Sequence, residues 1–412
     1  MNGQSSSTPK DGEYLNFLQE VLLAVHNSNG DPIIVHTILQ ANLAKLDLHL
    51  ADVLKIWATE KLAEAQPDQS LFDIGTNIFT FCNLLLDFVL GNRADNIEII
   101  IAGYEIALTA FNRQDFPDSW GKVQTYLGNA YKSRIHGEYA NNLEIAIAYS
   151  QEALTECTRD RFPQIWALSQ HHLGNAYYER IRGERAENIE TAIVCYQEAL
   201  KEYTRNANPY RWSVILKDMG AAYSDRILGE RADNLEAAIS YYQESLTECT
   251  RERFPQDWAA TQINLGNAYS NRIRGEEAEN IEAAISCYEE ALKESSRDRN
   301  PLFWGWIHMS LAKAYNERIR GEQADNLEKA IACGRKALEE CTRDRFPRHW
   351  AMIQNNLGIA YSNRIFGEHA ENLETAIACY QESLEERTRE CLPYDWARTQ
   401  NSLGSTYSKH PQ

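Results

Sequence analysis

The sequence predicts an all-α fold, and within that class a right-handed α-solenoid built from helix–turn–helix repeats. Tryptophan recurs every 46 residues from Trp120 to Trp396, and proline recurs every 46 residues from Pro117 to Pro393, without an insertion. Apolar residues between these landmarks follow the spacing of helices. A constant period of this length is typical of stacked repeats, in which each unit packs only on its neighbours.

Each repeat is predicted to begin with a helix whose first turn holds the proline, because proline lacks an N–H group and has a helical φ angle. In the repeat that begins at Pro163, Gly183 is expected to end this helix. The equivalent glycines are Gly137, Gly229, Gly275, Gly321 and Gly367. The apolar stripe of the helix comprises Trp166, Leu173, Ala176, Tyr177 and Ile181.

A second helix follows in each repeat. Asn188 is placed to cap its N-terminus through the side-chain oxygen, and Glu190 suits the positive end of the helix dipole. The equivalent asparagines are Asn142, Asn234, Asn280, Asn326 and Asn372. The apolar stripe comprises Ile189, Ala192, Ile193, Tyr196, Ala199 and Leu200, with small residues where the two helices approach each other. The helix is expected to end near Thr204.

Three residue types that recur with the period are interpreted as structural. Arg180 and Glu184 are predicted to form an ion pair that braces the turn, the alternative being one element of a ligand-binding array. The tryptophans are expected in the core between repeats, the alternative being an aromatic binding strip. Cysteines that share a repeat position, such as Cys195 and Cys287, lie about one repeat apart, too far for a disulfide. We therefore expect reduced, buried thiols.

These patterns divide the chain into five segments. Residues 1–11 are expected to be disordered. Residues 12–65 form a helical N-terminal region, which is either an interaction domain or a cap over the first repeat. Residues 66–111 form a degenerate first repeat, and residues 112–392 the regular array. Residues 393–412 form a C-terminal capping helix and tail.

Within the N-terminal region, two amphipathic helices are expected over residues 13–26 and 50–65. The segment Asn-Ser-Asn-Gly-Asp-Pro at residues 27–32 is a turn signal. The region should therefore be helical on both sides of one turn.

The charge of the chain limits its partners. The formal net charge is −18, from 41 Lys and Arg against 59 Asp and Glu. This charge repels nucleic acid phosphates and anionic lipid head groups, so we expect neither a nucleic acid nor a membrane partner. The sequence shows neither a secretory signal nor an apolar run long enough to span a bilayer. A cytoplasmic protein with a basic or neutral polypeptide partner is the prediction.

The helix pair resembles the tetratricopeptide repeat, whose first helix carries Leu-Gly-x-x-Tyr and whose second carries Ala, an aromatic residue and Ala. The matching residues here are Leu173, Gly174, Tyr177, Ala192, Tyr196 and Ala199. The resemblance covers residues 112–407, and more weakly the chain from about residue 66. The usual repeat of that family has 34 residues, so the longer period implies longer helices. The tryptophan also lies further before the leucine than in the family.

A narrower resemblance concerns the strings that begin at Phe254 and Phe346. They are similar to long tetratricopeptide arrays of cyanobacterial proteins, which often precede a caspase-like CHAT peptidase domain. The sequence carries no such domain after the array, and no residue matches the His/Cys pair of the peptidase, so protease activity is not implied. An alternative function is the sensor or regulatory arm of a CHAT protease system whose peptidase is on another chain.

The resemblance also implies that first helices line a concave groove in which a peptide binds. The residues expected to bind it are Asn129, Asn175, Asn267, Thr125, His171, Lys217, Lys313 and Asn355. These positions vary more between repeats than the apolar frame does. An asparagine amide offers both a donor and an acceptor, so a row of them could bind the backbone of an extended peptide. A solvated groove without a ligand is the other interpretation.

The sequence contains no motif of the common catalytic sites, such as GxxxxGK[ST], HExxH or GxSxG. We therefore expect no enzymatic activity, no cofactor and no metal. The predicted function is a protein–protein interaction scaffold or regulatory subunit that binds an extended peptide or partner protein in its groove. Packing of two copies into a homodimer is compatible with this prediction.

Overall fold

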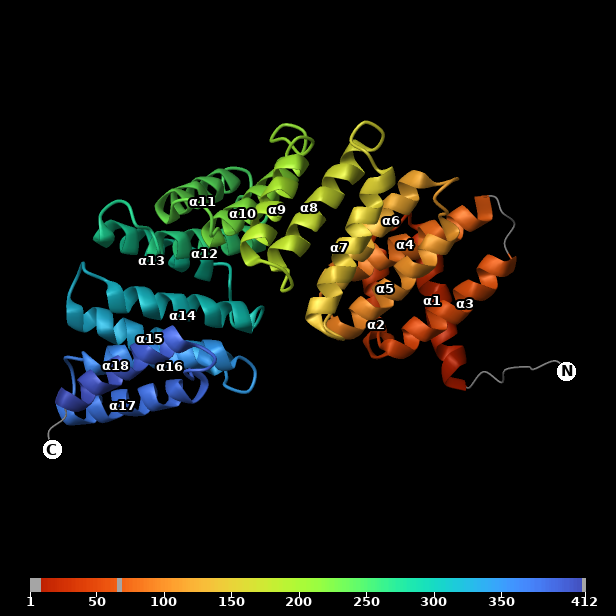
Figure 1. Cartoon of the computed structure of the whole chain (residues 1–412). Helices are drawn as coiled ribbons and strands as arrows, with labels where there is room; N and C mark the ends of the chain where they lie inside the picture. The colour runs from red at the N-terminus through yellow and green to blue at the C-terminus, as the bar shows by residue number, and fades with distance from the viewer. Residues whose placement is uncertain (1–8, 65–68, 410–412) are drawn as a thin grey trace. The chain divides into compact units, whose positions relative to one another are not determined.

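The computed structural model describes residues 9–64 and 69–409. Over these residues the chain forms eighteen α-helices and one short 3₁₀ helix, without a strand (Figure 1). The helices fall into two compact units that divide between Asn208 and Pro209. The all-α prediction is confirmed, and each unit is described by itself.

Unit 1 holds the N-terminal helices and three hairpins. The N-terminal helices are α1 (Pro9–Asn27), α2 (Pro32–Ala41) and α3 (Leu48–Glu64), with the 3₁₀ helix at Leu43–Lys45. The hairpins are α4 (Gln69–Asp87) with α5 (Arg93–Ala110), α6 (Pro117–Lys132) with α7 (Tyr139–Glu156), and α8 (Pro163–Glu179) with α9 (Arg185–Ala199).

Unit 2 holds four hairpins and a final helix. The hairpins are α10 (Pro209–Asp225) with α11 (Arg231–Ser245), α12 (Pro255–Ser270) with α13 (Glu277–Leu292), α14 (Pro301–Glu317) with α15 (Gln323–Glu340), and α16 (Pro347–Ser362) with α17 (His369–Glu386). The final helix is α18 (Pro393–Lys409).

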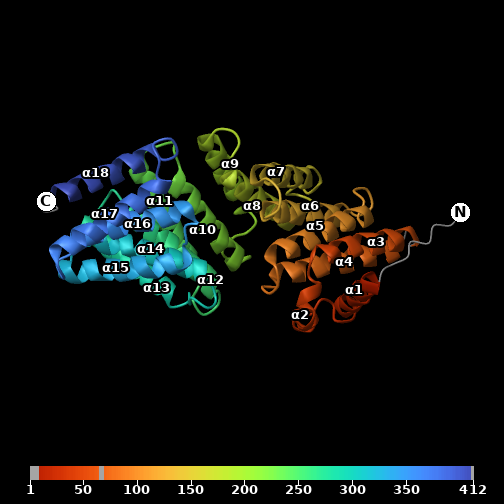
Figure 2. The ribbon, with the colours of Figure 1, turned by 90° about the horizontal axis from the view of Figure 1, so that it is seen from below.

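Consecutive hairpins stack within each unit. In unit 1, α5 packs on α6 and α7 on α8; in unit 2, α11 packs on α12, α13 on α14 and α15 on α16. Figures 1 and 2 both show helices α14 to α17 side by side. This arrangement is that of an α-solenoid of helix–turn–helix repeats, which confirms the predicted architecture.

The N-terminal region differs from the prediction in two places. Residues 1–8 of the segment expected to be disordered lie outside the described residues, whereas α1 already begins at Pro9. Between the two expected helices lies a third, α2, whose first N–H groups are capped by the Asp31 side chain at 2.9 Å from the Ile33 nitrogen. The short segment after the turn signal therefore continues the helical pattern, because Asp31 and Pro32 form a good helix start.

The N-terminal helices share their core with the first hairpin. Leu18, Leu39 and Leu54 are buried in one continuous apolar cluster with Ile78 of α4 and Tyr104 of α5. Burial of apolar surface between the two segments stabilises both. The N-terminal region therefore covers the first hairpin.

The first helices approach their second helices closely at glycine. A Cβ atom on Gly174 of α8 would lie 2.6 Å from Cε1 of Tyr196 on α9, so no larger residue fits without movement of the ring. Gly220 with Tyr242, Gly266 with Tyr288 and Gly358 with Tyr380 make the same contact in unit 2. The glycine of the Leu-Gly-x-x-Tyr pattern is thus explained by a tyrosine ring that packs directly on the backbone.

The turns between the two helices correct the predicted helix ends. The first helix α8 ends at Glu179, and Gly183 lies in the turn with φ +78°, a conformation that glycine adopts readily. Glu184, not Asn188, is the N-cap residue of α9. Asn188 lies inside the first turn of α9, is buried, and donates from Nδ2 to the Arg182 carbonyl at 2.8 Å. The asparagines therefore hold the turn against the helix instead of capping it.

The prediction that Arg180 forms an ion pair at the turn is correct, but the predicted partner is wrong. Arg180 donates from Nε and Nη2 to the two oxygens of Glu144, each at 2.8 Å, and not to Glu184. This hydrogen bonding holds the pKa of Glu144 below its ordinary value. The pair joins one turn to the second helix of the preceding repeat. The same pairs are Arg134–Glu98, Arg272–Glu236, Arg318–Glu282 and Arg364–Glu328.

The tryptophans lie at the edge of the core. Trp120 and Trp212 are buried, and the other five tryptophans of the series are half-buried. An arginine from the preceding loop covers the ring in six repeats, as Arg159 does with its guanidinium 5.8 Å from the centre of Trp166. Such contacts add a cation–π attraction to the apolar packing.

Candidate functional site

The eight residues predicted to bind a peptide do not share one environment. Thr125, His171 and Asn355 are buried, whereas Asn267 is exposed. The remaining four are half-buried, namely Asn129, Asn175, Lys217 and Lys313. The predicted binding residues therefore fall into two groups, a buried layer and an accessible layer.

The buried layer corrects part of the predicted site. Thr125 donates to the Gly121 carbonyl at 2.8 Å and lies 2.5 Å from the hydroxyl of Ser169, in the first helix of the next repeat. Asn355 accepts a hydrogen bond from Thr399 at 3.0 Å, also in the next first helix. The position two residues before the leucine thus contacts the neighbouring repeat, because the helix rotation turns it toward that helix and away from solvent.

Asparagines of the accessible layer are held by tyrosines. Tyr196 of α9 donates its hydroxyl hydrogen to Oδ1 of Asn175 on α8 at 2.7 Å, and Tyr288 does the same to Asn267 at 2.8 Å. In unit 1 the pair Tyr104 and Asn83 repeats this contact at 2.6 Å. Asn83 belongs to the degenerate first repeat and was missed, although it lies 46 residues before Asn129.

This contact changes the chemistry expected of the asparagines. The carbonyl oxygen accepts from the tyrosine, so the NH₂ group is the end of the amide that remains to donate. In Asn175 the NH₂ nitrogen lies 3.4 Å from Nε2 of His171. Asn129 lacks the tyrosine, because Ser150 occupies the equivalent position. At Asn83, Asn175 and Asn267, therefore, the amide offers a ligand mainly its N–H donors.

The two lysines bind neighbouring first helices. Lys217 lies 3.3 Å from Asp257, which also accepts from the Tyr210 hydroxyl at 2.9 Å. Burial lowers the pKa of Lys217, but nearby Asp218 and Asp257 outweigh it and leave the pKa above its ordinary value. Lys313 donates to the Ser270 hydroxyl at 3.2 Å. Both ammonium groups therefore stabilise the stack in addition to any role with a ligand.

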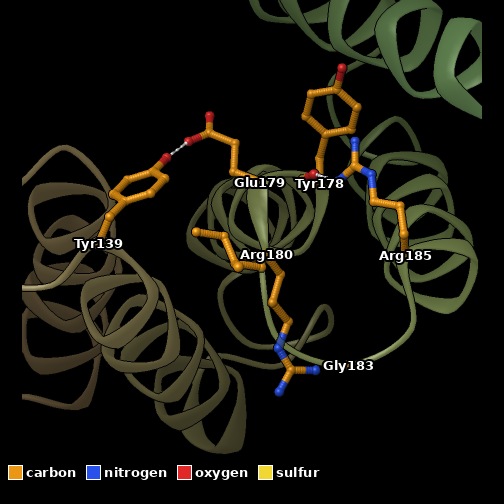
Figure 3. Close-up of a pocket in the computed structure, with 7 residues that line it drawn as sticks. Tyr139, Tyr178, Glu179, Arg180, Gly183 and Arg185 are labelled. Carbon is orange, nitrogen blue, oxygen red and sulfur yellow. Dashed lines mark hydrogen bonds between the residues drawn. The ribbon is translucent and has the colours of Figure 1, made fainter. Parts of the chain in front are cut away.

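A cavity of about 480 Å³ lies at one turn of unit 1. Figure 3 shows the Tyr139 hydroxyl directed at Glu179, to whose carboxylate it donates. Glu179 also pairs with Lys132 at 3.0 Å. Arg185 donates to the Tyr178 carbonyl and lies over the Tyr178 ring at 5.0 Å. The other residues that line the cavity are Arg180, Ile181 and Gly183.

This cavity could accept an apolar or aromatic side chain of a partner. Its lining includes two tyrosines and an isoleucine, and its charged groups are paired, Glu179 with Tyr139 and Arg180 with Glu144 outside the lining. The sequence does contain a signal for it. Tyr139 stands where the next repeat has Arg185, and Tyr178 stands where the next repeat has Ser224. Two tyrosines that depart from the repeat pattern therefore indicate the position of the cavity.

A row of exposed aliphatic residues also went unrecognised. Ile181 was assigned to the apolar stripe of the first helix, but its side chain is 62% exposed and lies after the end of α8. The equivalent residues are also exposed, namely Val89 and Ile135 in unit 1 and Ile227, Ile273, Ile319 and Ile365 in unit 2.

Metal and membrane features are lacking in what the structure describes. Over residues 9–64 and 69–409, no three His, Cys, Asp or Glu side chains converge as metal ligands. The helices described here likewise include none with the length and apolar character needed to cross a membrane.

Comparison with known proteins agrees with this geometry. The family model described as Tetratricopeptide repeat matches residues 166–202 and 258–298. These two segments are therefore similar to the tetratricopeptide repeat, in agreement with the resemblance seen in the sequence. The search of curated proteins gave no match.

Several solved structures are similar at low identity. The Rap conjugation gene regulator of the plasmid pLS20, in complex with the Phr* peptide, is 13% identical, with 88% of this chain and 95% of that chain covered and a TM-score of 0.45. The tetratricopeptide domain of P58(IPK) is 13% identical, with 96% and 98% covered and a TM-score of 0.30. A circular tandem repeat protein is 12% identical, with 97% and 98% covered and a TM-score of 0.29.

Proposed function

We propose that this chain is a protein–protein interaction scaffold or regulatory subunit that binds an extended polypeptide segment along its first helices. In unit 1 the contacts would come from the accessible asparagines Asn83, Asn129 and Asn175, and in unit 2 from Asn267. Their amide N–H groups would donate to backbone carbonyls of the ligand. In unit 2, Lys217 and Lys313 would add positive charge.

The observation that carries the proposal is the support of the asparagines by tyrosines. Tyr196 and Tyr288 are almost fully buried, so their hydroxyl groups cannot themselves contact a ligand. Each hydroxyl fixes an asparagine amide at the accessible side of a first helix. Preorganised donors lose less entropy on binding than free side chains do. The same bond satisfies the buried tyrosine hydroxyl, and the fixed amide supports a binding role.

The cysteines support a reducing, cytoplasmic environment and argue against a cysteine nucleophile. All nine cysteines are free, and most are buried. Burial raises the pKa of the Cys195 thiol to about 12 and that of Cys157 to about 11. A buried, protonated thiol is a poor nucleophile. Free thiols in this number are usual where disulfides do not form.

The proposal is tested with peptides selected from a random library against the full chain. Binding of the selected peptides is then measured by calorimetry for the wild type and for Asn267→Asp. The aspartate keeps the oxygen that Tyr288 binds but removes the N–H donors. We expect about tenfold weaker binding, since one hydrogen bond contributes about 1.4 kcal/mol.

Asn141→Asp is the matched control. Asn141 is exposed on the second helix α7, and its side-chain oxygen accepts from Arg182, which an aspartate oxygen would continue to do. This variant should bind like the wild type. Equal binding by the wild type and by variants at Asn83, Asn175 and Asn267 would contradict the proposal, as would a selection that yields no ligand.

A further inference from the structure

The turns between first and second helices of unit 2 carry two rows of exposed side chains. The first row is aliphatic and consists of residues between 56% and 61% exposed, namely Ile227, Ile273, Ile319 and Ile365. The second row is acidic and lies three residues further along each turn, at Glu230, Glu276, Glu322 and Glu368. These glutamates are exposed N-cap residues, and none of the four uses its side chain to cap the helix. We call this surface, over residues 227–233, 273–279, 319–325 and 365–371, the turn edge of unit 2.

The turn edge of unit 2 is strongly acidic. Against three arginines it carries nine exposed carboxylates, namely Glu230, Asp233, Glu276, Glu277, Glu279, Glu322, Asp325, Glu368 and Glu371. Two of the arginines already contact a carboxylate of the preceding turn, since Arg274 pairs with Asp233 and Arg320 lies 3.6 Å from Glu279. The equivalent turns of unit 1, at residues 89–95, 135–141 and 181–187, carry four carboxylates against three arginines. The turn edge of unit 2 therefore attracts a basic ligand, and that of unit 1 has no comparable charge.

A polar cavity of about 300 Å³ borders the aliphatic row at Ile319. Asn316 also lines it, and the Asn316 Oδ1 atom is buried and accepts no hydrogen bond from the residues that the structure describes. A buried acceptor without a partner is unfavourable, so a ligand that donates a hydrogen bond is favoured here. Arg318 lines the cavity too, but both oxygens of Glu282 bind and neutralise its guanidinium. The cavity therefore suits a long side chain that ends in a donor.

The spacing of the aliphatic row fits an extended ligand. The first helices of neighbouring repeats in unit 2 contact each other, and packed helices lie about 8–10 Å apart. Three residues of an extended or polyproline II chain span about the same distance, roughly 9–10 Å. A segment with an apolar residue at every third position can therefore contact one isoleucine in each repeat.

We propose that the turn edge of unit 2 binds an extended, basic polypeptide segment in which an apolar residue recurs at every third position and lysine or arginine lies between. The apolar side chains of the segment pack on the aliphatic row, and its cationic groups pair with the acidic row. One cationic side chain enters the cavity and donates to Asn316. The net charge of −18 disfavours a second copy of this chain as the occupant. The proposal does not depend on the asparagines of the first helices.

The test uses the full chain and a fluorescein-labelled peptide of four Leu-Pro-Lys repeats, whose prolines keep it extended. Binding is followed by fluorescence anisotropy, and we expect it to be saturable with the wild type. The double variant Ile273→Ser, Ile319→Ser should bind about tenfold more weakly, because two apolar contacts are lost. The double variant Glu276→Gln, Glu322→Gln should bind about fivefold more weakly, because two exposed charge pairs are lost. A peptide of the same composition with its four leucines adjacent should bind more weakly than the regular one.

The matched controls lie at the equivalent turns of unit 1. The double variant Glu138→Gln, Glu184→Gln removes the same charge, and Ile135→Ser removes an isoleucine that is also 60% exposed. Both should bind the peptide like the wild type, which separates the turn edge of unit 2 from an effect of net charge.

Three results overturn the proposal: no saturable binding, equal binding by the wild type and the isoleucine double variant, or an equal loss in the variants of unit 1. Equal binding of the peptide with adjacent leucines overturns it as well. Weaker binding by Asn267→Asp, with unchanged binding by both double variants of unit 2, would assign the peptide to the first helices and also overturn it.

Discussion

The hairpin α16–α17 and the helix α18 have closely related sequences but different surroundings. Gly358 lies under the Tyr380 ring, whereas Gly404, 46 residues later, borders open space. The same residue is therefore required by packing in one place and has no such requirement in the other. In a repeat protein, the role of a residue depends on which neighbours are present, and substitutions at equivalent positions can measure that dependence.

The largest expected difference is between Gly358→Ala and Gly404→Ala. The methyl group at 358 displaces the Tyr380 ring, so we expect a net loss of about 2–3 kcal/mol in the free energy of unfolding. At 404 the methyl group has room and favours the helix, so we expect a gain of up to about 1 kcal/mol. Urea unfolding followed by circular dichroism measures both. Equal changes in the free energy of unfolding would contradict the difference in packing between Gly358 and Gly404.

A second test concerns His308 in the interior of α14. Its side chain is 5% exposed, and burial, with a smaller effect of Lys336 on α15, lowers its pKa from 6.5 to about 4. Between these values the unfolded chain binds a proton that the folded chain does not, so stability is present above pH 6.5 and is lost as pH falls toward 4. We expect a loss of about 1–3 kcal/mol across this window.

His308→Gln is the control, because the equivalent position in α12 and α16 is glutamine, at Gln262 and Gln354. The variant should lack this part of the pH dependence when urea midpoints are measured across the same window. An identical pH profile in wild type and variant would contradict a neutral, buried imidazole.

The ion pairs between repeats should have an intermediate effect. Arg318 binds both oxygens of Glu282 and is only partly exposed, so Arg318→Ala should cost about 1–2 kcal/mol. Arg320 lies 3.6 Å from Glu279 with both side chains mostly exposed, and Arg320→Ala should cost less than about 0.5 kcal/mol. Thermal and urea unfolding of the two variants distinguish the cases, and a reversed order would show that the pair does not join the repeats.

The smallest expected effect is that of Tyr288→Phe. The ring keeps its place on Gly266 but no longer donates to Asn267, which should cost about 1 kcal/mol or less. Tyr394→Phe is the control, since the Tyr394 side chain is 78% exposed. In the peptide-binding assay Tyr288→Phe should weaken binding slightly, whereas Tyr394→Phe should not. If both variants weakened binding equally, the Tyr288 hydroxyl would have no special role in positioning Asn267 for the peptide.

The repeat architecture could be predicted because its signal is periodic. Tryptophan, proline and glycine recur at the same positions of every hairpin. A wrong assignment at one position therefore does not change the predicted fold. Helix ends were predicted less well. Asn188 has the chemistry of an N-cap, but Glu184 holds that position, because the turn is closed by the asparagine side chain bonded to a loop carbonyl. The hydrogen bonding of the turn thus outweighed the preference of asparagine for the N-cap position.

Only some of the residues predicted to bind a peptide are accessible. Asn175 and Asn267 lie where a ligand could reach them, but Thr125 and Asn355 are buried between first helices. Which side of a helix faces the next repeat depends on packing angles that a single sequence does not reveal. The cavity at Tyr139 and Tyr178 is indicated in the sequence by two tyrosines that depart from the repeat pattern.

The central claim is that equivalent hairpins stack through equivalent interfaces, and deletion of one repeat tests it most directly. Removal of residues 255–300 joins Phe254 to Pro301 and brings Arg318 to the position of Arg272, where Glu236 can bind it. We predict a folded, helical protein with a cooperative unfolding transition, whereas removal of residues 255–294 should not give one. A shorter deletion that folds as well as the full repeat, or a full-repeat deletion that aggregates, would contradict the account.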